Sequence, residues 1–272
     1  MQACEQWRLI LDGCASGHRN MAVDDALMTS VLCAERIAAW SHTLRLYWFE
    51  PPALSIGANQ PLAEIDLAAC AAAGVDVVRR PTGGRAVLHD GCITYSVCGP
   101  AEGAVFGGGI HASYRRISEA LVSAVRELGL AAVLPATPKS RSTSTPSCFD
   151  SAAPYELLVA GRKLVGSAQV RRSGVALQHG SLRLWSGSVQ TPALVNARSA
   201  RLQTVESVDP PTLSELLDRS VSRAAAGAAL AEGFSKSFSV TLCPAGLDEH
   251  ENQLAIAVDT GRYNSSQWTS RR

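Results

Sequence analysis

Residues 155–185, YELLVAGRKLVGSAQVRRSGVALQHGSLRLW, constrain the fold of this chain more than any other stretch. Apolar and polar side chains alternate along it, and an Ala-Gly pair and a Ser-Gly pair interrupt the alternation. A period of two predicts strands, and a short glycine-containing break between two such runs predicts a tight turn. We therefore expect a hairpin over 155–172, followed by a third strand over 174–185.

Helical and strand patterns alternate along the rest of the chain. Apolar residues at helical spacing predict helices over 20–38, 63–74, 111–129 and 212–233, the first of them capped by Asn20. Strand patterns occupy 43–49 and 75–80, a loop rich in proline and glycine covers 50–60, and PTGGRAVLHDGCITYSV (81–97) predicts a further hairpin. Because helices interleave with tight hairpins, we expect a mixed sheet rather than a parallel one.

Composition limits the partners and the compartment that we expect. A length of 272 residues allows one large α/β domain with a small appendage, and a hydrophobic content of 46% supplies its core. The net charge of +1 gives no reason to expect a nucleic-acid partner. The chain starts without a signal-peptide pattern, and no apolar stretch reaches the roughly 18 residues that span a membrane. Eight scattered cysteines show no zinc-binding spacing, so we expect a cytoplasmic protein with no metal site and no membrane partner.

The glycine pair Gly83-Gly84 has two interpretations. It lacks the Gly-Lys-Ser/Thr ending of a Walker loop, and a hairpin rather than a dinucleotide-binding helix is expected after it. Adjacent glycines let the backbone approach a ligand closely, and Arg79, Arg80 and Arg85 would attract a carboxylate, a phosphate or a carbonyl group. A bulged hairpin with solvated arginines fits the same residues. The residues alone leave both interpretations open.

Cys148 and Lys163 are candidates for a nucleophile and its activating cation. A thiol with a pKa near 8.5 is mostly protonated at neutral pH, so a catalytic cysteine needs a neighbouring cation or base. Lys163 could supply that charge if its hairpin folds back onto the loop that holds Cys148, and His179 is an alternative base. The residues alone also allow a buried structural cysteine, a solvated turn lysine and a hydrogen-bonded core histidine.

An ordered set of motifs narrows these alternatives. They are WRLILDG, NMAVDDAL, LSIGANQ, RRPTGGRAVLHDGCITYSV, CFDSAAPYELLVAGRKLVGSAQVRRSGVALQHGSLRL and YNSSQW. From residue 7 to the C-terminus the chain resembles the biotin/lipoate protein ligase superfamily, and it most resembles the branch of cysteine-dependent octanoyltransferases. The resemblance implies an α/β (α+β) fold with a central mixed β-sheet flanked by helices. We expect a single domain over 1–272, with a catalytic core at 38–233 and a short C-terminal extension at 234–272.

The resemblance also implies roles for particular residues. Cys148 would carry the acyl group as a thioester, and Lys163 would lower the pKa of its thiol. The segments around the glycine pair, GSAQ and QHGS would line the acyl tunnel. The implied substrate-binding residues are Arg80, Gly83, Gly84, Arg85, His89, Gly166, Ser167, Ala168, His179 and Gly180. Cys92 adds a second thiol near this pocket, where relatives usually have another residue type, and we interpret it as a packing residue.

The implied activity is octanoyl transfer in lipoate biosynthesis, with no cofactor. Octanoyl would pass from octanoyl-acyl carrier protein through Cys148 to a lysine of a lipoyl domain or of the glycine cleavage H protein. The alternatives are an ATP-dependent lipoate–protein ligase, a protein-to-protein octanoyl amidotransferase, and a catalytically silent binding protein. Arg85 after the glycine pair, where ligases tend to have a third glycine, disfavours the ligase. The presence of both Cys148 and Lys163 disfavours the silent relative, whereas the choice of donor stays open.

Overall fold

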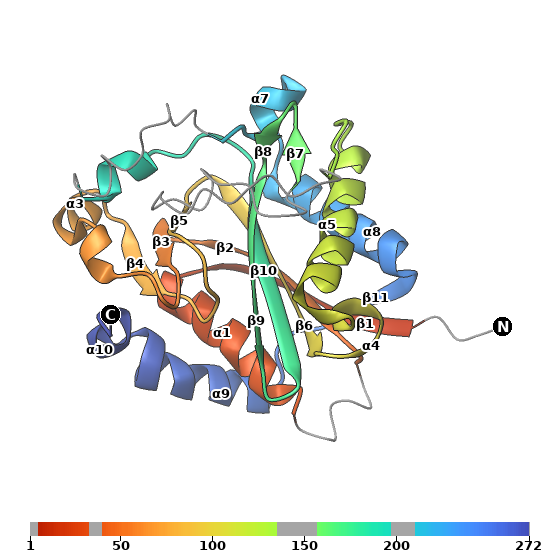
Figure 1. Ribbon diagram of the computed structural model, residues 1–272, viewed down its shortest axis with the longest axis horizontal. Helices are drawn as coiled ribbons and strands as arrows, with labels where there is room; N and C mark the ends of the chain where they lie inside the picture. Colours follow the sequence, from red (N-terminus) through yellow and green to blue (C-terminus); the bar gives the residue numbers. More distant parts are fainter. Residues whose placement is uncertain (1–4, 33–39, 135–156, 197–209, 272) are drawn as a thin grey trace.

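The computed structural model describes residues 5–32, 40–134, 157–196 and 210–271, so Cys148 lies outside the described residues. A central six-stranded sheet has the order β11-β1-β2-β6-β10-β9 (Figure 1). Its strands are β1 (Glu5–Ala15), β2 (Thr43–Phe49), β6 (Cys92–Pro100), β9 (Val165–Arg172), β10 (Val175–Arg183) and β11 (Val240–Pro244). β1 pairs in parallel with β11 and β2, whereas the β2–β6, β6–β10 and β10–β9 pairs are antiparallel. The expected central mixed sheet is therefore confirmed.

A smaller sheet and a short hairpin complete the β-structure. The smaller sheet has the order β4-β3-β5 and consists of β3 (Ala53–Ile56), β4 (Asp76–Arg79) and β5 (Val87–His89). The hairpin joins β7 (Leu158–Val159) to β8 (Arg162–Lys163) and leads directly into β9. In Figure 1 the smaller sheet lies to the left of β9 and β10.

Helices flank the central sheet. On one side α5 (Gly109–Glu127) packs against α8 (Arg223–Phe238), and on the other α1 (Gly17–Ser30) packs against α9 (Glu249–Val258), as Figure 1 shows. The shorter helical segments are η1 (Leu62–Glu64), α3 (Leu67–Ala72), α4 (Gly103–Phe106), η2 (Thr191–Leu194), α7 (Leu213–Leu217), η3 (Asp259–Tyr263) and α10 (Ser266–Thr269). The largest apolar cluster joins strand residues such as Tyr95 to Phe106 and Phe234 on the α5–α8 side. Among the described helices, none is both long and apolar enough to cross a bilayer.

The turns around β9 confirm the pattern from which the fold was predicted. Ala160 and Gly161 have φ values of 49° and 76°, and Ser173 and Gly174 have values of 50° and 78°. Two consecutive residues at positive φ form the turn whose twist matches that of the flanking strands. Both predicted turns therefore close antiparallel pairs, β7 with β8 and β9 with β10. The strands expected over 43–49 and 75–80 and the helix expected over 111–129 are also confirmed, within a few residues at each end.

The hairpin predicted within residues 81–97 is wrong. β5 pairs with β3 in the smaller sheet, whereas β6 pairs with β2 and β10 in the central sheet. The turn at Asp90 and Gly91 therefore connects two sheets. The Asp90 carboxylate accepts hydrogen bonds from the backbone N–H groups of Ser188 and Val189, and the Gly91 carbonyl accepts from Trp185. These bonds to a distant segment fix a connection that local alternation cannot distinguish from a hairpin.

Four other predicted elements differ from the structure. The helix expected over 63–74 is the 3₁₀ turn η1 followed by the shorter helix α3. The expected loop 50–60 contains the fully buried strand β3. The first helix is capped by Ser16 rather than Asn20, whose buried side-chain amide donates to the Ala15 and Trp48 carbonyls. Its predicted extension over 33–38 lies outside the described residues. The single helix expected over 212–233 is two helices, because Asp218 is left-handed at the end of α7 and Ser222 caps α8.

Candidate active site

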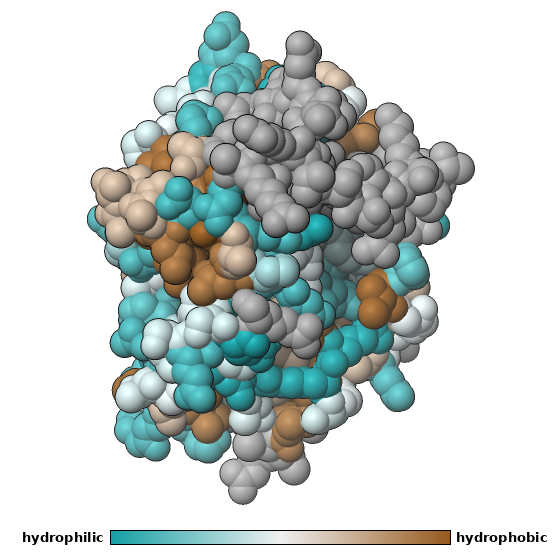
Figure 2. Space-filling view, turned by 60° about the vertical axis from the view of Figure 1, so that its left-hand side comes forward, coloured by the Kyte–Doolittle hydropathy of each residue, from teal (hydrophilic) through white to brown (hydrophobic). Residues whose placement is uncertain are grey.

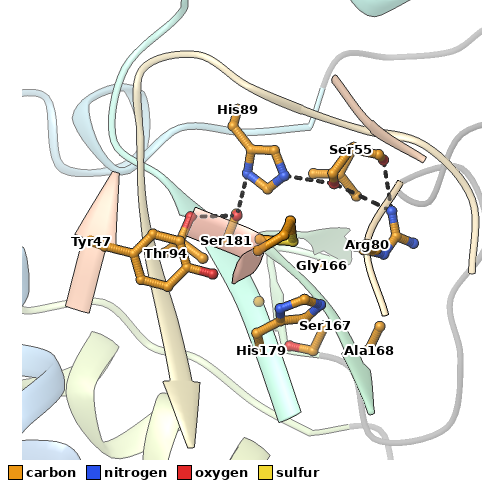
Figure 3. A pocket seen from close by; sticks show the side chains of 13 residues that line it. Tyr47, Ser55, Arg80, His89, Thr94, Gly166, Ser167, Ala168, His179 and Ser181 are labelled. Carbon is orange, nitrogen blue, oxygen red and sulfur yellow. Dashed lines mark hydrogen bonds between the residues drawn. The ribbon is translucent and has the colours of Figure 1, made fainter. Parts of the chain in front are cut away.

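A cavity lies between the smaller sheet and strands β9 and β10 of the central sheet. Its empty space, including the open mouth, is about 330 Å³. Its lining residues are Met21, Tyr47, Ser55, Arg80, Val87, His89, Thr94, Gly166, Ser167, Ala168, His179, Gly180 and Ser181 (Figure 3). Seven of the ten predicted substrate-binding residues are among them, and Gly83, Gly84 and Arg85 are not.

Those three residues form the loop beside the cavity. Gly84 has a φ of 94°, a conformation that side chains other than that of glycine rarely adopt. Its carbonyl packs so closely on Gly57 that a β-carbon at Gly57 would overlap it. The glycine pair therefore does allow a close backbone approach, but the backbone that it approaches is that of Gly57. Arg85 forms an ion pair with Glu64, at 3.0 Å between Nη1 and Oε2, and neither residue lines the cavity.

The buried side chain of Arg80 holds this loop in place by hydrogen bonds to its carbonyl groups. It is only 3% exposed, and its Nη2 donates to the carbonyls of Gly83 and Arg85, both at 2.7 Å. Its Nη1 donates to the Ser55 carbonyl at 2.7 Å, and its Nε donates to the Thr82 hydroxyl at 3.1 Å. The guanidinium that the sequence offered for anion binding therefore has protein acceptors on all three of its nitrogens.

A chain of hydrogen bonds runs along the cavity wall through His89. Its Nε2 lies 2.7 Å from the Ser55 hydroxyl, and its Nδ1 lies 2.8 Å from the Ser181 hydroxyl, which in turn lies 2.9 Å from that of Thr94 (Figure 3). The ring also stacks on Phe49 at a centroid distance of 4.0 Å. Burial, together with the charge of Arg80, holds the pKa of His89 well below its usual value of 6.5, so the ring is neutral. One ring nitrogen then donates and the other accepts, which satisfies both.

On the opposite wall, His179 is held by a buried carboxylate. Its Nδ1 lies 3.0 Å from Oδ2 of Asp24, and its Nε2 lies 2.7 Å from the Thr82 hydroxyl. Asp24 also accepts hydrogen bonds from Arg45, Tyr47 and Ser96, each at 2.9 Å. Burial alone would raise the pKa of the Asp24 carboxyl, but the hydrogen bond from His179 and the charge of Arg45 lower it overall. Asp24 is therefore a carboxylate.

Of the two residues predicted to be catalytic, Cys148 lies outside the described residues and Lys163 lies within them. Lys163 ends β8, opposite Leu158, and is only 7% exposed. It is therefore not the solvated turn lysine that the residues alone allowed.

Cys92 is 3% exposed, and burial raises the pKa of its thiol to about 11, which keeps it protonated at neutral pH. The interpretation of Cys92 as a packing residue is confirmed.

Several cavity residues were missed by the sequence interpretation. Ser181 lies two positions after His179 on β10, so both side chains face the same side of the sheet, and Thr94 is its cross-strand partner. Strand alternation could therefore have identified Ser181. No comparable signal points to the others, because they come from distant elements and meet only in the folded chain. They are Met21 from α1, Tyr47 from β2, Ser55 from β3, and Val87 from β5. Asp24 of α1 was also missed; it does not line the cavity but binds His179, which does.

The cavity suits an apolar ligand despite its polar walls. Only two buried side-chain polar atoms of the described residues lack a hydrogen-bond partner, Nε2 of His42 and Nε of Arg223, and neither residue lines the cavity. The polar groups on the walls are therefore paired with protein, and an alkyl chain would not strip them of partners. In the part of the chain that the structure describes, no three His, Cys, Asp or Glu side chains are grouped to hold a metal ion.

Known proteins resemble this chain in both sequence and fold. The family model described as the lipoyl protein ligase A/B catalytic domain matches residues 16–235. Octanoyltransferase LipM of Symbiobacterium thermophilum is 39% identical over 98% of both chains. Octanoyltransferase LipM of Moorella thermoacetica is 37% identical over 98% of this chain and 99% of its own. A solved structure of lipoate-protein ligase A bound with ATP has a TM-score of 0.80, 24% identity, and coverage of 97% of this chain and 98% of its own. At that identity the match shows the shared fold.

Proposed function

Because this chain belongs to the lipoyl protein ligase A/B catalytic-domain family, we propose that it is an octanoyltransferase of lipoate biosynthesis. One observation carries the proposal. Octanoyltransferases LipM of several bacteria are 34% to 39% identical to this chain and match at least 98% of its length. The reaction needs a reduced thiol, which fits a reducing cytoplasm.

The proposed reaction has two acyl transfers through Cys148. In the first, the Cys148 thiolate attacks the octanoyl thioester of acyl carrier protein, the donor C–S bond breaks, and the carrier thiol leaves with the proton that Cys148 gave up. In the second, the ε-amine of a lysine on a lipoyl domain or a glycine cleavage H protein attacks the octanoyl–Cys148 thioester. The new C–N bond replaces the C–S bond, the amine loses a proton, and Cys148 is regenerated.

Lys163 is the proposed partner of Cys148. A lysine that is 7% exposed is partly desolvated, so its charge acts on a neighbouring thiol more strongly than it would in water. In its charged form it favours the thiolate, and it can pass a proton when the acceptor amine attacks. The proposed place for the octanoyl chain is the cavity between the two sheets, where an alkyl chain would contact Met21, Val87 and Ala168.

The experiment that tests this function compares three sets of substrates, with a lipoyl domain as acceptor and mass spectrometry as the readout. Octanoyl-acyl carrier protein without ATP should give octanoyl-lipoyl domain, and Cys148→Ala should not. An octanoylated H protein as donor tests the amidotransferase alternative. Free octanoate or lipoate with ATP tests the ligase alternative. Product formed only in the presence of ATP would overturn the proposal.

A further inference from the structure

A continuous chain of hydrogen bonds joins Asp24 on α1 to Arg80, the residue after β4. His179 bridges the Asp24 carboxylate and the Thr82 hydroxyl, at 3.0 Å and 2.7 Å, and Arg80 Nε donates to the same hydroxyl at 3.1 Å. All four residues are buried, with Asp24 and Thr82 at 0% exposure. Asp24 itself does not line the cavity, whereas His179 and Arg80 do.

The chemistry of the two ends fixes the direction of every bond in this chain. A carboxylate only accepts, so Nδ1 of His179 carries a hydrogen and donates it to Asp24. A guanidinium only donates, so the Thr82 oxygen accepts from Arg80 and its own hydrogen is available for Nε2 of His179. Nε2 accepts that hydrogen when the imidazole is neutral. The arrangement therefore selects the Nδ1–H tautomer of His179.

This tautomer matters for the cavity because the chain of hydrogen bonds ends at Arg80, which binds the loop beside the cavity. Arg80 holds the carbonyls of Gly83 and Arg85. The Thr82 carbonyl accepts from the backbone N–H of Ala58 at 2.8 Å. If the hydrogen of His179 moved to Nε2, the Thr82 oxygen would face two donors. Its own hydrogen would then have no acceptor among the bonds that the described residues make.

We propose that Asp24 is a positioning residue for acyl transfer: by fixing His179 as the Nδ1–H tautomer, it holds Thr82, Arg80 and the loop beside the cavity in place. This inference rests on the proposed function. It gives a role to NMAVDDAL, a motif that the proposed reaction does not otherwise use. Asp24 acts through His179 and needs no contact with the acyl group.

The variant Asp24→Asn tests the tautomer directly. Arg45 and Ser96 bind Oδ1, and because a guanidinium only donates, the new amide oxygen should stay on that side. The amide NH2 group then faces the Tyr47 hydroxyl, which can turn to accept, and His179, whose Nδ1 must accept, so the hydrogen moves to Nε2. The matched control is Ser96→Ala, which removes one hydrogen bond from Asp24 without reversing any bond of the chain.

The tautomer can be measured by ¹⁵N NMR on protein labelled at its six histidines, since N–H and lone-pair nitrogens have well-separated shifts. His179→Gln assigns the signal. The wild type and Ser96→Ala should show the Nδ1–H tautomer, and Asp24→Asn should show Nε2–H. A wild-type Nε2–H tautomer, or an unchanged tautomer in a folded Asp24→Asn, would overturn the inference.

Activity measurements test whether the same chain serves octanoyl transfer. Losing one buried hydrogen bond is worth roughly a tenfold change, so Asp24→Asn and Thr82→Val should each slow transfer about tenfold, and Thr82→Ser should restore it. The double variant should be no slower than the slower single one, because both changes break one chain. Additive losses, or full activity in Thr82→Val, would refute the positioning role. If the wild type transfers no octanoyl while the His179 tautomer changes as expected, the proposed function is refuted, but the proposed chain of hydrogen bonds is supported.

Discussion

The carbonyl oxygen of Gly84 occupies the space that a β-carbon on Gly57 would need. Gly57 follows β3 and Gly84 lies in the loop beside the cavity, so this contact joins two loops through their backbones. The contact explains why both the LSIGANQ and the TGGRAV motifs contain glycine at these positions. The fold therefore requires glycine at position 57, whereas Gly83 has no atom in the space that a β-carbon would occupy.

Gly57→Ala should therefore destabilise the protein, whereas Gly83→Ala should not. The new methyl group at residue 57 would overlap backbone, and overpacking of this kind typically costs about 1–3 kcal/mol. A β-carbon at Gly83 meets no atom within 4 Å, and its backbone is not at positive φ, so it is the matched control. Denaturant unfolding of both variants measures the difference. Equal stability of the two would show that the loops can separate without cost.

The buried side chain of His42 should make folding stability depend on pH. Burial lowers its pKa to about 4, only partly opposed by the charge of Glu5, and its Nε2 has no partner among the described residues. Between about pH 6.5 and 4 the unfolded chain therefore binds a proton that the folded chain does not. The contribution of His42 alone should lower the free energy of unfolding by roughly 3 kcal/mol as the pH drops from about 6.5 to 4.

His42→Phe should remove this part of the pH dependence, because a phenyl ring can keep the tilted ring contact with Trp7 without taking up a proton. Urea unfolding from pH 7 to pH 4 gives the comparison. His89 contributes in the same direction, so some slope should remain in the variant. An identical slope in wild type and variant would mean that His42 binds its proton equally well in both states.

The cysteines should differ sharply in alkylation. Burial raises the pKa of Cys92 to about 11, and Cys98 is fully buried, whereas Cys14 is exposed. At pH 8 iodoacetamide should label Cys14 in the folded protein and reach Cys92 and Cys98 only after unfolding. Peptide mass spectrometry distinguishes the sites. Rapid labelling of Cys92 in the folded state would make it a competing nucleophile near the cavity.

The sequence was sufficient to predict those elements whose hydrogen bonds join residues close to one another along the chain. The hairpins around β9 depend on two-residue turns and on alternation within a few residues, and both were predicted. His179 and Ala168, which face each other across those strands, were likewise expected at the cavity. Local geometry and motif together therefore located one wall of the site.

The other wall depends on contacts between distant segments. Whether β5 pairs with β6 or with β3 is decided by packing in the smaller sheet, which alternation along β5 does not encode. Asp24 lies 155 residues from His179 in sequence, and nothing about an aspartate in a helical pattern indicates that it will be buried. Burial of a carboxylate is decided by its donors, Arg45, Tyr47 and Ser96, which come from other strands.

Lys163 should control the ionisation of the Cys148 thiol. At about 4 Å and an effective dielectric near 20, the attraction between an ammonium and a thiolate is on the order of 4 kcal/mol before desolvation opposes it. Lys163→Ala should therefore raise the pH midpoint of iodoacetamide labelling at Cys148. Lys163→Arg keeps the charge but does not readily pass a proton, so it should keep a low midpoint while losing transfer to the acceptor. An unchanged midpoint in Lys163→Ala would remove this lysine from thiol activation.

The most direct test of acyl transfer through Cys148 is the mass of the protein after brief mixing with octanoyl-acyl carrier protein in the absence of ATP and acceptor. We expect a single octanoyl group, labile to hydroxylamine and located on the Cys148 peptide. Adding a lipoyl domain should discharge this group to the acceptor lysine. Cys148→Ser should not form the hydroxylamine-labile thioester, whereas Cys92→Ala should form it normally. Octanoyl transfer to the lipoyl domain without any adduct on Cys148, or an adduct that persists in Cys148→Ala, would contradict the central claim.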